Sequence, residues 1–288
     1  MKTFLFVNPT SGHHSTKRLQ DALYWLHIRA IVPELFEVRT PTDISACCTT
    51  INKERDPHLV IVAGGDGTFN AVVNGLDPGS ATLAVLPFGT SNVLAAEIGI
   101  TSIEDALERI AAGNTRSLSV GVIELEGRSH RFVLMAGIGL DGAVVRDVHP
   151  LWKKLLRQGG YALSAFTHAI SWDDTVFEVS TSEKNLTCHS VIICNASRYG
   201  GNFILEPAST LFSTGLTALC VTDNTRRTYL RIASDLFRGT EQQSRNLVRH
   251  SVSAIEIHGT KAIQIDGDFI GHGPARISAK PDFARIIV

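Results

Sequence analysis

Residues 59–76, LVIVAGGDGTFNAVVNGL, constrain the fold of this chain more than any other stretch. The segment begins with an apolar run, residues 59–63, whose length and β-branching are typical of a buried strand. Glycines interrupt the run, and apolar residues then recur with the spacing of one helix face over residues 69–76. A strand, a glycine turn and a helix start in this order place free N–H groups and the positive end of a helix dipole where an anion can approach. The sequence therefore predicts a phosphate-binding turn.

The glycine turn differs from the common nucleotide-binding loops. It is not a Walker P-loop, because no Lys-Ser or Lys-Thr follows the glycines, and it does not match GxGxxG. Asp66 stands between Gly65 and Gly67. A carboxylate there repels phosphate unless it holds a cation or positions a nucleophile, so Asp66 indicates Mg²⁺ binding or acid–base chemistry. An ordinary turn between a strand and a helix in an α/β core is the alternative.

Composition narrows the class of protein. With 288 residues the chain suits two domains, and its 27 basic and 28 acidic residues, a net charge of −1, argue against a nucleic-acid partner. The five cysteines form no CxxC pair, which favours reduced thiols in a cytoplasmic protein. The N-terminal apolar run is shorter than a signal peptide, and prolines and glycines in residues 78–96 exclude a membrane-spanning helix. Any membrane contact is expected to be peripheral, at the inner membrane face, and a homo-oligomer is one possible state.

An α/β domain is expected over residues 1–117. The predicted strands are residues 3–7, 34–39, 59–63 and 82–87, and the predicted helices are residues 16–29, 69–76, a helix opening at residue 93, and 103–112. This alternation indicates a parallel sheet with helices on both faces. The carboxyl ends of parallel strands form the ligand crevice, where Asn8, Thr40, residues 64–68 and residues 89–92 should gather.

A second polar turn follows the fourth predicted strand. It reads LPFGTSN over residues 86–92 and opens a helix at Val93. Thr90 and Asn92 stand where helix caps and anion donors are found. A capped turn alone would explain this segment, but the glycine turn upstream makes a shared site the better interpretation.

After residue 117 helical periodicity gives way to short β-like segments. Residues 118–279 are therefore expected to form a mostly antiparallel domain, as a sandwich or a partial barrel. The predicted strands are residues 119–125, 131–136, 175–180, 190–195, 216–221, 253–258 and 261–265. Between His149 and Asp174 the sequence predicts a helical stretch with clustered aromatic and basic residues. It is either a surface for anionic lipid headgroups or a helix packed on a sheet.

Residues 137–142 match GxGxxG, but we do not interpret them as a dinucleotide site. They lie in the β-rich half, outside a clear βαβ unit, and they lack the acidic residue that ends a second strand. Asp141 in this segment has either a structural or a functional role.

Residues 262–269, AIQIDGDF, are predicted to form a strand that carries Asp266 and Asp268 on either side of Gly267. Residues two apart on a strand project to the same face, so both carboxylates could enter one cleft. A hairpin turn that contains Asp-Gly is the alternative.

Residues 64–68, GGDGT, resemble the signature shared by diacylglycerol kinases, sphingosine kinases and NAD kinases. Residues 86–92 resemble LPxGTxN, the second motif of the lipid kinases. NAD kinases instead carry an acidic residue directly after an asparagine, and this sequence contains no Asn-Glu or Asn-Asp. The chain is thus similar to the bacterial type of the diacylglycerol and sphingosine kinase family. The resemblance implies an N-terminal α/β domain with a parallel sheet, to which residues 280–288 return, and a mostly antiparallel β-sandwich C-terminal domain.

The resemblance implies an ATP-dependent lipid kinase. With Mg²⁺, the γ-phosphate would pass to a lipid hydroxyl, such as that of diacylglycerol or a sphingoid base, presented at a membrane surface. The implied catalytic residues are Asp266 and Asp268, one of which supplies the base, and Asp66 as a partner of Mg²⁺. The implied nucleotide contacts are Asn8, Thr40, Gly64, Gly65, Asp66, Gly67, Thr68, Phe69, Asn70, Gly89, Thr90 and Asn92. A further Mg²⁺ site is implied at Leu211, Thr214 and Leu216.

Departures from the family pattern bear on activity. Relatives commonly have Glu where Ala71 stands, Arg where Ala96 stands, and Glu where Asp268 stands. Bacterial relatives have Asp at the position of Thr214, and without that carboxylate the further Mg²⁺ site keeps only backbone oxygens. A non-catalytic paralogue that binds nucleotide or lipid in a regulatory role is therefore the alternative. A kinase of a soluble metabolite is a third hypothesis.

Overall fold

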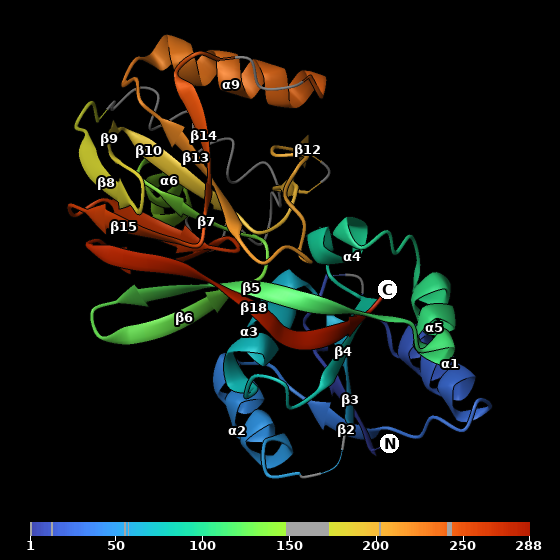
Figure 1. The fold of residues 1–288 in the computed structure, drawn as a ribbon. Coiled ribbons are helices and arrows are strands. Elements are labelled where there is room, and N and C mark those ends of the chain that lie inside the picture. Colours follow the sequence, from blue (N-terminus) through green and yellow to red (C-terminus); the bar gives the residue numbers. More distant parts are fainter. Residues whose placement is uncertain are drawn as a thin grey trace. The chain divides into compact units, whose positions relative to one another are not determined.

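The computed structural model of this chain describes residues 2–12, 14–54, 56, 58–147, 173–201, 203–240 and 244–288. The chain divides into two compact units (Figure 1), which are Met1–Ser119 with Pro281–Val288, and Val120–Lys280. The helical stretch predicted between His149 and Asp174 lies outside the described residues, except for its last two positions. In the described ranges no helix has the length and apolar character needed to cross a bilayer.

The first unit is built on a sheet of parallel strands. These are β1 (Lys2–Val7), β2 (Glu34–Glu37), β3 (His58–Gly64) and β4 (Thr82–Pro87), which pair in the order β2-β1-β3-β4. The last part of β18 (Ala275–Ile287) pairs in parallel with β4. Strands β1, β3 and β4 are apolar and largely buried, as expected for strands covered on both faces. The predicted parallel α/β domain is confirmed.

Helices cover both faces of this sheet. They are α1 (Thr16–His27), α2 (Pro41–Ile51), α3 (Asp66–Gly75), α4 (Val93–Glu97) and α5 (Ile103–Ala112). Helices α1 and α5 lie on one face, and α2 and α3 on the other (Figure 1). Local signals set several boundaries, because Ser15 caps α1 by accepting from the N–H of Arg18, and Gly113, at φ +71°, ends α5.

Helix α2 was not predicted from the sequence pattern. Its residues, PTDISACCTTI, include many β-branched and cysteine side chains of modest helix propensity. The helix forms because Thr40 and Asp43 make a capping box at its start, and because Ile44, Cys48 and Ile51 bury one face.

Two antiparallel sheets make up most of the second unit. One has the order β14 (Leu247–Val252), β13 (Leu216–Val221), β10 (Ser190–Cys194), β7 (Met135–Ile138), β16 (Ala262–Ile265) and β17 (Asp268–His272). The other contains the first part of β18, β15 (Ala254–His258), β8 (Phe177–Thr181), β9 (Asn185–Cys188), β5 (Thr115–Leu125) and β6 (Arg128–Phe132). Side chains from both sheets, among them Phe132, Val179, Ile193 and Ile277, form one buried cluster. The predicted antiparallel sandwich is confirmed.

The segment 131–136, predicted as one strand, is divided between two. Strand β6 ends at Phe132 and β7 begins at Met135. The N–H groups of Val133 and Leu134 donate to the carboxylate of Asp266, at 2.7 and 2.9 Å, instead of joining a β-ladder. A distant side chain therefore interrupts a segment whose local sequence favours a strand.

Helices α6 (Leu140–Asp147) and α9 (Arg226–Arg238) and the small pair β11 (Arg198–Tyr199) and β12 (Phe203–Ile204) complete the described part of the second unit. Neither helix was predicted. In α9 the spacing of Tyr229, Ile232 and Leu236 would have sufficed to predict a helix. These residues pack on the sheet that contains β10, β13 and β14, on the face that lies away from the sandwich core.

His189 joins α9 to this sheet through a buried side chain. Its Nδ1 lies 2.6 Å from the hydroxyl of Tyr229, and its Nε2 lies 2.6 Å from the backbone carbonyl of Asp173. Because a carbonyl only accepts, Nε2 carries the proton of the neutral ring. Burial lowers the pKa of His189 below its ordinary value of 6.5.

We expect the free energy of unfolding to fall as the pH drops below about 6.5, because the unfolded chain then binds a proton that the buried ring of His189 resists. One such group contributes a slope of up to about 1.4 kcal/mol per pH unit. The substitution His189→Gln should flatten the dependence on pH of the free energy of unfolding, which urea unfolding at a series of pH values measures. A slope from His250, whose pKa burial also lowers, should remain. An unchanged curve in His189→Gln would contradict this assignment.

Candidate functional site

The parallel strands of the first unit end level with one another. The register pairs Val7 of β1 with Glu37 of β2 and Ala63 of β3, and it pairs Gly64 of β3 with Pro87 of β4. The turns that follow these strands therefore lie along one edge of the sheet. They carry the predicted site residues Asn8, Thr40, Gly64, Gly65, Asp66, Gly67, Thr68, Gly89, Thr90 and Asn92. Crevices outside the carboxyl ends of parallel strands are common ligand sites in α/β folds.

Close packing of these turns requires several of their glycines. The N–H of Gly89 donates to the carbonyl of Gly64 at 3.1 Å. A Cβ atom on Gly89 would overlap the Cα atom of Gly65, and one on Gly12 would overlap the hydroxyl of Thr90. The glycines therefore permit contact between the turns themselves, in addition to any contact with phosphate.

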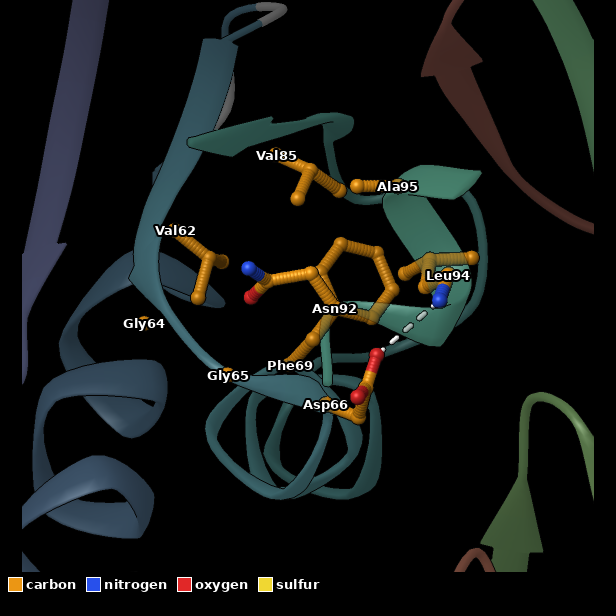
Figure 2. Close-up of a pocket in the computed structure, with 9 residues that line it drawn as sticks. All are labelled: Val62, Gly64, Gly65, Asp66, Phe69, Val85, Asn92, Leu94 and Ala95. Atoms are coloured by element: carbon orange, nitrogen blue, oxygen red, sulfur yellow. Dashed lines mark hydrogen bonds between the residues drawn. The ribbon is translucent and has the colours of Figure 1, made fainter. Parts of the chain in front are cut away.

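The carboxylate of Asp66 caps helix α4. Its Oδ2 accepts from the N–H of Val93 at 3.1 Å, and its Oδ1 accepts from the N–H of Leu94 at 2.9 Å, the bond drawn in Figure 2. Asn92, the N-cap residue of α4, is left-handed at φ +47° and makes no side-chain cap. Burial raises the pKa of Asp66, and the two N–H groups offset part of that rise. This capping role was missed by the sequence reasoning, which considered only a cation or a nucleophile for Asp66.

Asn92 is directed into a small cavity behind the turns (Figure 2). The cavity has a volume of about 10 Å³, which suits about one water molecule. Its lining consists of Val62, Gly64, Gly65, Asp66, Phe69, Val85, Asn92, Leu94 and Ala95. The Nδ2 of Asn92 donates to the carbonyls of Gly89, at 2.9 Å, and Pro87, at 3.4 Å. The amide of Asn92 therefore holds the second turn in shape, while Thr90 is exposed.

Two of the predicted residues connect or cap the neighbouring turns. Asn8 donates from its Nδ2 to the hydroxyl of Thr68 at 2.9 Å, which ties the turn after β1 to the turn after β3. Thr40 is exposed, and its hydroxyl accepts from the N–H of Asp43 as the cap of α2. Both side chains thus have structural partners at the site edge.

The start of α3 is open to an anion. Its N-cap, Gly65, has no side chain to accept from the first N–H groups, and a Cβ on Gly67 would meet no described atom within 4 Å. Phe69 packs in the core, and the Oδ1 of Asn70 accepts from Asn74 at 2.7 Å on the helix surface. The backbone N–H groups, rather than these two side chains, are therefore the donors available at the start of this helix.

In the second unit, the prediction that Asp266 and Asp268 project from one face of a strand is wrong. Strand β16 ends at Ile265, and Asp266 and Gly267 form the turn of a hairpin, at φ +46° and +88°. Strand β17 then begins at Asp268, whose side chain is exposed. The alternative of an Asp-Gly hairpin turn therefore describes this segment.

Asp266 anchors its turn to a loop far away in the sequence. Its carboxylate accepts from the N–H groups of Val133 at 2.7 Å, Leu134 at 2.9 Å and Met135 at 2.9 Å. Three donors stabilise the ionised carboxylate and leave it little freedom to reach a substrate. The two aspartates therefore have different surroundings, and Asp268 is the more accessible.

Asp141 and Gln264 support the same hairpin turn. The Oε1 of Gln264 accepts from the N–H of Gly267 at 2.8 Å, and its Nε2 donates to Asp141 at 2.6 Å. The hydroxyl of Tyr199 donates to the other oxygen of Asp141, and burial raises the pKa of this carboxyl. Asp141 is thus a structural residue here. Sequence reasoning missed Gln264 and Tyr199, because neither stands in a recognisable motif.

The described residues include no group of three or more His, Cys, Asp or Glu side chains that could hold a metal ion. Asp66 offers a carboxylate between the turns that follow β3 and β4, which is compatible with Mg²⁺ that arrives with a nucleotide. At the further site Leu211 and Leu216 are buried, and Thr214 is exposed and lacks a carboxylate. This set of donors does not fit a second Mg²⁺ site.

Comparison with known proteins extends over both units. The family described as "Diacylglycerol kinase catalytic domain" matches residues 2–123, and the family described as "YegS C-terminal NAD kinase beta sandwich-like domain" matches residues 135–288. The diacylglycerol kinase of Bacillus subtilis (strain 168) is 26% identical over an alignment of 288 positions, which covers 94% of this chain and 90% of that protein. The protein named "Probable lipid kinase YegS-like" in Shewanella frigidimarina (strain NCIMB 400) is 27% identical over 156 residues, 51% of this chain and 49% of that protein.

A solved structure shares the fold. The crystal structure of a diacylglycerol kinase from Bacillus anthracis str. Sterne superposes with a TM-score of 0.74, covering 99% of this chain and 96% of that chain at 18% identity. The fold, the two turns and the sequence matches together define a two-domain protein of the lipid-kinase class. This chain belongs to the family that joins a diacylglycerol kinase catalytic domain to a YegS-type C-terminal domain.

We expect Gly89→Ala to destabilise the protein by about 1–3 kcal/mol, the usual cost of overpacking, because the added Cβ would overlap the backbone of Gly65. Gly67→Ala is the matched control, since its Cβ has room and alanine is the better helix former. Urea unfolding of the two variants measures the difference. Equal stability would show that the turns do not pack in this way.

Proposed function

We propose that this chain is an ATP-dependent lipid kinase, which transfers the γ-phosphate of ATP to a lipid hydroxyl such as that of diacylglycerol or a sphingoid base. One observation carries the proposal: the open N-terminus of α3 lies beside the turn of residues 86–92 at one sheet edge. Such an edge supplies N–H donors to a polyphosphate. Membership of a lipid-kinase family favours a lipid as the acceptor.

Different polar groups at this sheet edge would contact different parts of the nucleotide. Phosphate oxygens would accept from the N–H groups of residues 64–68 and from the exposed hydroxyl of Thr90. Asn8 and Thr40, which follow the two neighbouring strands, would lie near the rest of the nucleotide. Most of the acceleration would come from positioning and from electrostatic stabilisation of the transferring phosphoryl group.

Asp66 is the residue that would hold Mg²⁺. Each of its oxygens accepts one N–H bond from α4 and keeps further lone-pair capacity, so a contact through bound water is compatible with its present bonds. The bound ion would offset the charge of the phosphates. Because Asp66 also caps α4, a substitution there would disturb the second turn as well as the charge.

Asp268 is the better candidate for the catalytic base. It is exposed at the start of β17, whereas the carboxylate of Asp266 is occupied by three N–H donors. The Asp268 carboxylate would take the proton of the acceptor hydroxyl as that oxygen bonds to the γ-phosphorus, and the displaced oxygen would leave with ADP. Asp266 and Gln264 would act by holding the turn on which Asp268 stands.

The acceptor would be met at a membrane surface, because lipids with a free hydroxyl and long acyl chains reside in bilayers. The enzyme would work in the cytoplasm, where ATP is available, at the inner membrane face.

Transfer of labelled γ-phosphate from ATP into a mixed lipid extract, with Mg²⁺ and detergent, tests the proposal. We expect a labelled lipid with the wild type, and no label with Asp66→Ala or Asp66→Asn, the latter keeping one acceptor oxygen for α4. Asp268→Ala should lower the rate by about 10²–10⁴-fold, the usual contribution of a general base, while Asp268→Glu should be tolerated. Thermal unfolding of each variant separates loss of chemistry from loss of fold.

Equal turnover by all variants and the wild type would refute the assigned roles. If ATP binds but no lipid is labelled, either the lipid acceptor is wrong or catalysis is lost, and a non-catalytic nucleotide- or lipid-binding paralogue becomes the favoured alternative. The replacements at Ala71, Ala96, Thr214 and Asp268 are the sequence features that favour this alternative.

A further inference from the structure

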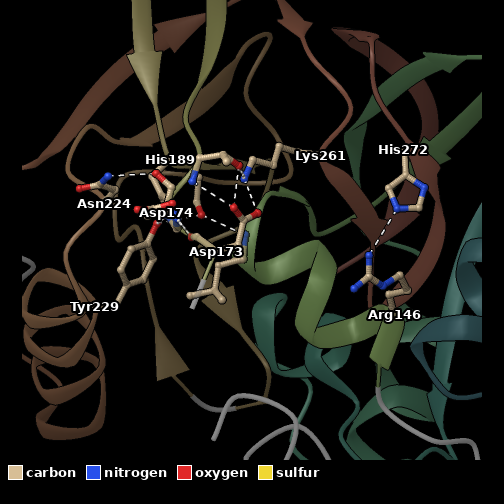
Figure 3. A network of polar contacts seen from close by, with 11 residues as sticks. Arg146, Asp173, Asp174, His189, Asn224, Tyr229, Lys261 and His272 are labelled. Atoms are coloured by element: carbon tan, nitrogen blue, oxygen red, sulfur yellow. Dashed lines mark hydrogen bonds and ion pairs between the residues drawn. The ribbon is translucent and has the colours of Figure 1, made fainter. Parts of the chain in front are cut away.

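Helix α9 is held firmly on its inner side. Tyr229, Ile232 and Leu236 pack on the sheet, and the hydroxyl of Tyr229 lies 2.6 Å from His189 and 2.8 Å from the hydroxyl of Ser190. Figure 3 shows this network, which continues to the start of the helix, where Asn224 donates to the carbonyl of Asp174 at 2.9 Å. The outer side of α9 therefore has a defined orientation.

The outer side of α9 combines apolar and basic side chains. Leu230 is 68% exposed and Phe237 is 73% exposed. The helix also carries four arginines against one aspartate, and its exposed arginines are Arg226, Arg227, Arg231 and Arg238. A helix that only faced water would be polar on this side, whereas Leu230 and Phe237 leave most of their apolar surface uncovered by the described residues.

The apolar surface continues onto β12. The ring of Phe203 packs edge-on against Phe237, with centroids 5.2 Å apart, and Ile204 is 46% exposed. We call Leu230, Phe237 and Ile204, together with the exposed arginines of α9, the α9 surface. The α9 surface is formed by residues of two elements of the second unit, α9 and β12.

We propose that the α9 surface binds the face of a bilayer that contains anionic lipids. Leu230, Phe237 and Ile204 would enter the boundary between headgroups and acyl chains, and the arginines would contact lipid phosphates. The inference rests on the proposed function in one respect, which is that a lipid kinase must reach its acceptor lipid at a membrane. The binding itself needs neither nucleotide nor catalysis.

The chemistry of the surface favours a bilayer over a folded protein partner. Leu230 and Phe237 project from one helix and Ile204 from the neighbouring β12, and a fluid interface can accept them without a complementary groove. The excess of arginines over aspartate on α9 matches the negative potential of an anionic leaflet. At thirteen residues the helix is too short to span the bilayer, so it would lie in the interface.

Co-sedimentation of the full chain with vesicles, without nucleotide, tests this inference. Vesicles of phosphatidylcholine alone are compared with vesicles in which phosphatidylglycerol replaces part of it. We expect the wild type to bind only the anionic vesicles, and we expect added salt to weaken this binding. The double variants Leu230→Ser/Phe237→Ser and Arg227→Gln/Arg231→Gln should each bind at least about tenfold more weakly than the wild type. Circular dichroism establishes that each variant keeps its fold.

Matched controls come from the first unit. The pair Tyr24→Ser/Val32→Ser removes side chains that are each 69% exposed, and Lys17→Gln removes an exposed charge of α1. These variants should bind vesicles as the wild type does. Equal binding by the α9 variants and the controls would overturn the inference, as would an effect of the α9 variants on self-association alone.

The assay separates this inference from the proposed function. If the protein phosphorylates lipid in detergent but does not bind anionic vesicles, membrane binding by the α9 surface is refuted and the proposed kinase activity is supported. If vesicles are bound through α9 but no lipid is ever phosphorylated, membrane binding is supported and the proposed kinase reaction is refuted.

Discussion

The hydrogen bonds from the start of α4 to the carboxylate of Asp66 are the interaction on which the site of the first unit depends. They join the turn after β3 to the turn after β4 and satisfy a helix start whose own N-cap, Asn92, makes no side-chain bond. Asp66 thus closes the positive end of α4, whereas the N-cap of α3, Gly65, has no side chain that could close the positive end of that helix. The glycines matter for the same reason, since they let the two turns approach closely enough for this bond to form.

A second aspartate has a comparable role in the other unit. Asp266 gathers the N–H groups of three consecutive residues that precede it by more than 130 positions, and Gln264 links its turn to the half-buried Asp141. Both Asp66 and Asp266 stand beside glycines in motifs that a chemist would assign to catalysis. In each case much of the carboxylate serves the backbone. These anchors hold other groups in place, which are the N–H groups at the start of α3 and the exposed carboxylate of Asp268.

Elements with strong local signals were predicted closely from the sequence. The bounds of α5 and β13 agree with those predicted, and β3 and the turn after it lie where the apolar run and the glycines placed them. Elements that depend on tertiary contacts were missed or misjudged. Helix α2 has weak propensity and is stabilised by its cap and its buried face, and the segment 131–136 is split because Asp266 takes its N–H groups. Helix α9 was missed although its periodicity was present.

The sequence by itself determined the parallel α/β class of the first unit, the antiparallel class of the second, and the position of the glycine turn between β3 and α3. Periodicity, glycine turns and helix starts are local patterns, and their physical causes act between residues close together in the chain. Only the tertiary structure decided what each carboxylate does. Whether Asp66, Asp141 or Asp266 is a cap, a buried support or a free acid depends on which donors the fold brings within hydrogen-bonding distance. Those donors come from distant parts of the sequence, so no local pattern identifies them.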